Sequence, residues 1–105
     1  VLVKPGDYRE THGGVAAVRI TKPLRLIADS NLPDVKVRIL PGPGQRHGIV
    51  VEPANPGDPD VQNVEVVGFT VEGFSNMGIW TRYVDGFVIE NNESIENLEN
   101  GIWPT

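Results

Sequence analysis

The sequence predicts an all-β fold and, within that class, a parallel β-helix of about four to five turns. Its composition and an internal repeat carry the prediction. Val and Ile make up 23 of the 105 residues, against 6 Leu and 4 Ala, while Gly and Pro make up 21. β-Branched residues favour strands and Gly and Pro favour turns, which excludes a helical bundle.

The repeat consists of two motifs, each of which recurs at the same distance along the sequence. Val61-x-x-Val64-x-Val66 recurs as Val84-x-x-Phe87-x-Ile89, and Gly78-Ile79-Trp80 recurs as Gly101-Ile102-Trp103. Two motifs that share one offset indicate a chain that coils, so that each short strand stacks in parallel on its counterpart one turn later.

A weaker copy of the repeat lies upstream. Gly48-Ile49 precedes Gly78-Ile79 at a longer offset, and the excess fits a loop inserted over residues 52–60. This stretch contains Pro53, Pro56 and Pro59, which exclude a strand or a helix there.

The expected strands show alternating apolar residues, which predicts one buried face for each. The residues predicted to point inward are Leu24, Leu26, Val35, Val37, Ile39, Val64, Val66, Val71, Ile79, Phe87, Ile89 and Ile102. Gly and Asn accept left-handed backbone conformations and suit the corners between strands. The expected corners are Gly68, Gly73, Asn91-Asn92 and Asn97.

Two other local structures compete with this interpretation. An antiparallel sandwich would use Asp85-Gly86 or Asn100-Gly101 as hairpin turns. A helix over 93–99 would follow from the regular spacing of Glu93, Glu96 and Glu99, although the asparagines of this stretch are poor helix formers. The sandwich explains the spacing of the turns but not the repeat.

Four stretches resemble the pectin lyase-like superfamily of right-handed parallel β-helix proteins. Residues 3–10 (VKPGDYRE) and 20–27 (ITKPLRLI) are similar to the opening of these proteins, 66–73 (VVGFTVEG) to a later rung, and 89–92 (IENN) to an Asn-rich corner. The resemblance implies that residues 1–105 are a single right-handed β-helix segment, the N-terminal rungs of a longer protein.

The same resemblance implies an extracellular or periplasmic protein that binds or processes acidic polysaccharide. If the parent protein is an enzyme, it is expected to be a polysaccharide lyase, an epimerase or a glycoside hydrolase. Catalytic residues of the superfamily usually lie on central rungs, so no catalytic position is assigned within this segment.

The strongest candidate site is aromatic. Trp80 and Trp103 share one repeat position, and because Ile79 and Ile102 beside them are expected to face inward, both indoles are expected to face outward. Such a ladder suits stacking against sugar rings, with Arg82 and Tyr83 as hydrogen-bonding neighbours. The alternative is that the two tryptophans pack under a loop or against a neighbouring chain.

Four basic residues form a second candidate binding site. Arg19, Arg25, Lys36 and Arg38 alternate with apolar residues and are expected to face outward, as a basic stripe for an anionic polymer or as an ordinary solvated face. A nucleic-acid partner is not expected, because the net charge is −5 and no known binding module is present.

Other residues give weaker signals. Asp58 and Asp60 in the inserted loop are candidate Ca²⁺ ligands, although they lack EF-hand spacing, and no other cofactor is expected. Two of the clustered glutamates could pair for acid–base chemistry, but they equally suit a solubilising surface. His47 lacks metal-ligand spacing and is assigned a structural role, and the absence of Cys excludes thiolate chemistry.

A structural role is the alternative function. Residues 1–50 carry a net charge of +4 and residues 51–105 one of −9. This polarity, with exposed strand edges at both ends of the coil, would favour self-association by end-to-end stacking, as in a scaffold. No apolar run approaches the roughly 20 residues needed to span a bilayer, so no membrane partner is expected.

Overall fold

Twelve short strands and no helix make up the part of the chain that the structure describes. The computed structural model describes residues 2–4, 6–9, 14–29 and 36–97, together with the backbone of 102–104. The strands are β1 (Leu2–Val3), β2 (Gly6–Arg9), β3 (Ala16–Ile20), β4 (Arg25–Ala28), β5 (Val37–Leu40), β6 (His47–Val51), β7 (Val61–Val67), β8 (Phe69–Glu72), β9 (Ile79–Thr81), β10 (Val84–Glu90), β11 (Glu93–Ile95) and β12 (Ile102–Pro104). Among these residues no helix could cross a membrane.

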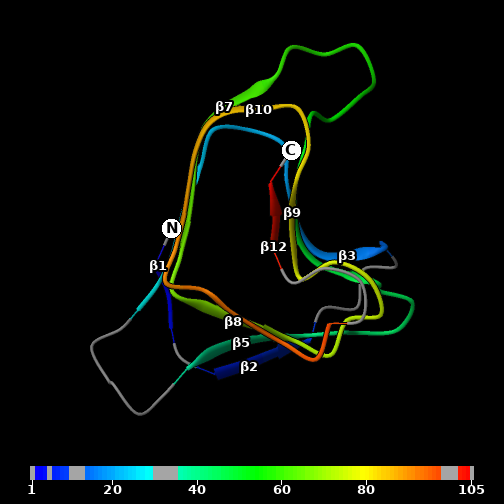
Figure 1. The fold of residues 1–105 in the computed structure, drawn as a ribbon, viewed down its shortest axis with the longest axis vertical. Helices are drawn as coiled ribbons and strands as arrows, with labels where there is room; N and C mark the ends of the chain where they lie inside the picture. Colours follow the sequence, from blue (N-terminus) through cyan, green and yellow to red (C-terminus); the bar gives the residue numbers. More distant parts are fainter. Residues whose placement is uncertain (1, 5, 10–13, 30–35, 98–101, 105) are drawn as a thin grey trace.

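The strands form three parallel sheets of four strands each: a first sheet (β1-β4-β7-β10), a second (β2-β5-β8-β11) and a third (β3-β6-β9-β12). The chain passes through the first, second and third sheets in that order four times, and the sheets enclose the interior from three sides (Figure 1). Parallel pairing excludes the antiparallel sandwich, and residues 93–95 form a strand rather than a helix. The arrangement is compatible with a parallel β-helix.

The strand register follows the sequence repeat. Val84 pairs with Val61 and Trp103 with Trp80, both at the offset that the repeat predicts. Ile49 pairs with Ile79, at the longer offset of the upstream copy. Residues 52–60 connect β6 to β7 as a loop, the green projection at the top of Figure 1.

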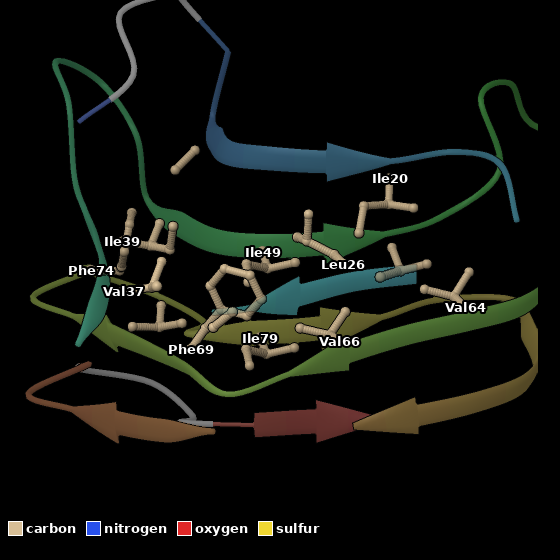
Figure 2. Packing of buried hydrophobic residues seen from close by; sticks show 14 of the residues in the cluster. Ile20, Leu26, Val37, Ile39, Ile49, Val64, Val66, Phe69, Phe74 and Ile79 are labelled. Carbon is tan, nitrogen blue, oxygen red and sulfur yellow. The ribbon is translucent and has the colours of Figure 1, made fainter. Parts of the chain in front are cut away.

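The core lies between the three sheets and consists of apolar side chains that stack from one strand to the next (Figure 2). Val64, Val66, Val71 and Ile79, all predicted to point inward, are at most 1% exposed. Phe87 lies in register with Val64 but is 37% exposed, because β10 is the last strand of its sheet among the described residues.

Asparagine side chains close two of the corners. Asn92 accepts a hydrogen bond from the Phe69 amide at 2.9 Å and donates one to the Val66 carbonyl at 2.9 Å. One corner later, Asn97 accepts a hydrogen bond from the Phe74 amide and donates one to the Val71 carbonyl. The side chains thereby pair backbone groups that the strand ladders leave at the corners, where Gly68 and Gly73 adopt positive φ.

Gly48 explains why glycine begins the weaker copy of the repeat. It is buried in β6, and a Cβ atom there would overlap the Val71 side chain and the Gly78 carbonyl. Only glycine allows this close approach between neighbouring turns of the chain.

Candidate functional site

Two adjoining hollows lie along the third sheet and the loop that follows it. The first, of about 730 Å³, is lined by residues of β3, β6 and β9. The second, of about 570 Å³, is lined mainly by the loop 52–60 and Tyr83. Arg19, Glu52 and Arg82 line both, so together the hollows form one groove, and each hollow by itself is within the size range of ligand sites.

Strand register sets the floor of the groove. Arg19 on β3 pairs with Val50 on β6, and Val50 pairs with Trp80 on β9. The next residues along these strands, Ile20, Val51 and Thr81, are buried in a neighbouring row. Because side chains alternate along a strand, Arg19, Val50 and Trp80 form a row on the outer face of the sheet.

The Trp80 indole contacts two other side chains. The His47 ring centroid is 5.2 Å from that of Trp80, with the rings tilted by 43°. The Arg82 guanidinium carbon lies over the indole, 4.7 Å from its centroid, in a cation–π contact. The indole Nε1–H is shielded from solvent and has no hydrogen-bond acceptor among the described residues. A buried donor without an acceptor is costly and unusual.

Glu52 joins two arginines across the groove. Its carboxylate accepts a hydrogen bond from Arg19 Nε at 2.9 Å and lies 3.4 Å from Arg82 Nη1. Arg19 also donates to the carbonyls of Pro53 and Ala54, at 3.3 and 3.2 Å. Arg82 instead contacts the rings of Trp80 and, at 5.9 Å, Tyr83. The two arginines outnumber Glu52 beside the indole, while Asp58 and Asp60 line the loop side of the same groove.

His47 is a neutral imidazole beneath this cluster. It is buried, and its Nδ1 accepts a hydrogen bond from the Met77 amide at 3.3 Å, which places the proton on Nε2. Burial lowers the pKa of His47 below its ordinary value, and the positive charges of Arg46 and Arg82 lower it further. Glu52 opposes this shift but does not reverse it.

The structure brings several of the sequence-predicted residues together. Trp80, Arg82 and Tyr83 meet at the groove, and Arg19 joins them from β3. Trp103 pairs with Trp80 in the strand register, and its side chain lies outside the described residues.

The other three basic residues lie elsewhere, so the four do not form one stripe. Arg25 on β4, in the first sheet, forms an ion pair with Glu65. Lys36, just before β5, pairs with Glu93 at 3.2 Å. Arg38 on β5 pairs with Glu72 and, at 3.2 Å, with Asp7. Arg25 and Arg38 meet carboxylates on adjacent turns, whereas the pair of Lys36 with Glu93 spans β8, the strand between β5 and β11.

The predicted calcium ligands lie in the loop beside the second hollow. Asp58 accepts a hydrogen bond from the Asn55 amide at 3.1 Å and so shapes the loop, and Asp60 lines the hollow. Within the described ranges no group of three or more His, Cys, Asp or Glu side chains is placed to hold a metal ion.

Sequence reasoning missed the roles of Glu52 and His47 at this site. Both follow from the longer offset between Gly48 and Gly78, which places Glu52 beside Arg82 and His47 beside Met77. Applying that offset to every polar residue of the two segments would have found them.

Comparison of the chain with protein-family models, with curated protein sequences and with solved structures gives no match.

Proposed function

We propose that the chain is part of an extracytoplasmic right-handed parallel β-helix protein, similar to the pectin lyase-like proteins, and that it binds acidic polysaccharide. The proposed binding site is the groove of the third sheet. The cyclic order of the three parallel sheets and the resemblance of residues 3–10 and 20–27 support the fold assignment.

The observation that carries the proposed function is the grouping of Trp80 with Arg19 and Arg82 along one open groove. An indole face suits the apolar C–H face of a sugar ring, and guanidinium groups suit the carboxylate of a uronic acid. Parallel strands lie about 4.8 Å apart, so the groove crosses several strands and favours an extended chain over a single small molecule.

A calorimetric titration with hexagalacturonate tests this function. Trp80→Ala removes the stacking surface and is expected to weaken binding at least about tenfold. Phe87→Ala, which truncates an exposed aromatic residue on the first sheet, is the matched control and should bind like the wild type. Equal affinities for the wild type and Trp80→Ala would contradict the proposal.

Self-assembly is the second candidate function, favoured by the opposite net charge of the two halves of the chain. Complementary charge steers two copies toward a head-to-tail arrangement and is weakened by salt. Size-exclusion chromatography at low and high salt tests stacking, and a monomer under both conditions would count against it.

A further inference from the structure

Arg82 occupies the position on Trp80 that a stacked sugar would need. Its guanidinium carbon lies 4.7 Å from the indole centroid, on the ring face. A sugar ring stacked on that face would compete for the same space. The groove of the third sheet therefore has a cap over its main aromatic surface.

The Arg82 side chain, which forms this cap, is held less firmly than the Arg19 side chain. Arg19 donates to Glu52 at 2.9 Å and to two loop carbonyls, which fix it in the groove wall. The Arg82 side chain is 41% exposed and reaches Glu52 at 3.4 Å, and its other contacts are with aromatic rings. An exposed ion pair of this kind contributes little stability, so Arg82 can move at small cost.

We propose that Arg82 is a charge-selecting cap, through which the groove admits an anionic sugar in preference to a neutral one. This inference rests on the proposed function of the groove. A ligand carboxylate replaces Glu52 as the partner of the Arg82 guanidinium and draws it away from the indole. The sugar ring then takes its place on Trp80. A neutral sugar provides no such partner and must displace the cation–π contact unaided.

The unpaired indole donor agrees with such an exchange. Trp80 Nε1–H has no acceptor among the described residues while the cap is closed. Because this donor is shielded from solvent, a sugar hydroxyl reaches the indole edge only after the side chain that covers it has moved. With Arg82 over the indole, the Nε1–H donor is left without a described acceptor. With a sugar in that place, the donor gains one.

Paired titrations test the selectivity. Hexagalacturonate and the same hexamer with methyl-esterified carboxyls differ chiefly in charge. For Arg82→Gln we expect affinity for the acidic hexamer to fall about tenfold, while affinity for the ester stays equal or rises. For Glu52→Gln, which releases the cap, we expect affinity for the acidic hexamer to rise. Lys22→Gln, an exposed cation outside the groove, has the same change in net charge as Arg82→Gln and should retain the wild-type preference.

A measurement without sugar separates this inference from the proposed function. In a Trp103→Phe background, Trp80 is the single tryptophan, and adding Arg82→Gln should increase its quenching by acrylamide because the ring face is uncovered. Unchanged quenching would overturn the cap even if the groove binds sugar. If quenching rises but neither hexamer binds the wild type, the proposed function fails, and with it the selectivity. If Arg82→Gln lowers both affinities equally, the charge-selecting role is overturned.

Discussion

The second and third sheets carry the same kinds of charged side chain on their outer faces but arrange them differently. On the second sheet, Arg38 lies between Asp7 and Glu72. On the third, Glu52 lies between Arg19 and Arg82, next to Trp80 and a groove. Carboxylates outnumber the cation in the first cluster, and cations outnumber the carboxylate in the second. Of the two clusters, only the second combines a net positive charge with an aromatic face.

On the proposed function, this difference corresponds to two roles of charge pairing between turns in one scaffold. Along the second sheet, ion pairs connect residues of neighbouring turns, and Arg38 has a carboxylate on either side. Along the third sheet, the pairing is incomplete, because Arg82 holds Glu52 only weakly and Trp80 Nε1–H has no described acceptor. A hollow that is lined by an aromatic ring and a few convergent polar groups is typical of a ligand-binding site.

Gly48→Ala should give the largest effect, because it breaks the scaffold beneath the groove. The new methyl group overlaps Val71 and the Gly78 carbonyl, and we expect a loss of about 3 kcal/mol in the free energy of unfolding. Chemical denaturation measures it. Gly44→Ala, where φ is +76° and nothing lies within 4 Å, tests backbone strain alone and should cost about 1 kcal/mol. Equal losses for the two variants would contradict the packing argument.

Asn92→Ala should destabilise the scaffold without changing the groove. The substitution leaves the Phe69 amide and the Val66 carbonyl without their partner, at an expected cost of about 2 kcal/mol. Asn92→Asp keeps an acceptor for the amide but loses the donor, so its cost should be intermediate. Denaturation midpoints check the order, and a calorimetric titration should give unchanged affinity for hexagalacturonate in both variants.

Mild acid should weaken the region around the groove through His47. The pKa of the folded-state imidazole is lowered below the ordinary value of about 6.5, so the unfolded chain binds the proton more readily. The contribution of the neutral His47 to the free energy of unfolding is therefore complete above about pH 6.5 and is lost as the pH falls toward the lowered pKa. Arg46, Arg82 and Glu52 are the charged groups that act on this imidazole.

His47→Asn tests the origin of this pH dependence. The asparagine amide oxygen can accept the Met77 hydrogen bond without titrating. Denaturation at about pH 7.5 and about pH 5.5 should show a smaller loss of stability in the variant than in the wild type. An identical pH dependence would assign the effect to other groups.

Arg38→Gln should give the smallest effect. Arg38 pairs with carboxylates on the exposed second sheet, where solvent and salt screen the interaction. We expect a slightly lower midpoint of thermal unfolding at low salt, no difference at high salt, and unchanged sugar affinity. A loss of affinity comparable to that of Arg82→Gln would remove the distinction between the two faces.

The register of the later strands could be predicted from the sequence, because the repeat there has a regular spacing. The constant offset of the repeat gives the register of β7 with β10 and of β9 with β12, and the longer offset of the upstream copy gives that of β6 with β9. Alternation then identified the inward-facing valines, because a strand with one buried face has a period of two.

The earlier turns were harder to predict because their connections differ in length. Leu2 pairs with Ile27 and Arg25 with Glu65 at two different offsets, and the pairings of β2 with β5 and of β3 with β6 share a third, so no single offset relates the earlier turns. Without a constant offset, the sequence does not show which carboxylate meets each cation. Alternation places Arg19, Arg25 and Arg38 outward, but it does not reveal that they lie on three different sheets.

The most direct test of the central claim is a map of amide chemical-shift changes by NMR as hexagalacturonate is added. We expect the largest changes at Arg19, Val50 and Arg82 and at the indole Nε1–H of Trp80, with small changes at Arg38 and Glu72. Changes concentrated on the second sheet, or spread evenly over all three, would contradict the assignment of the third sheet as the binding face.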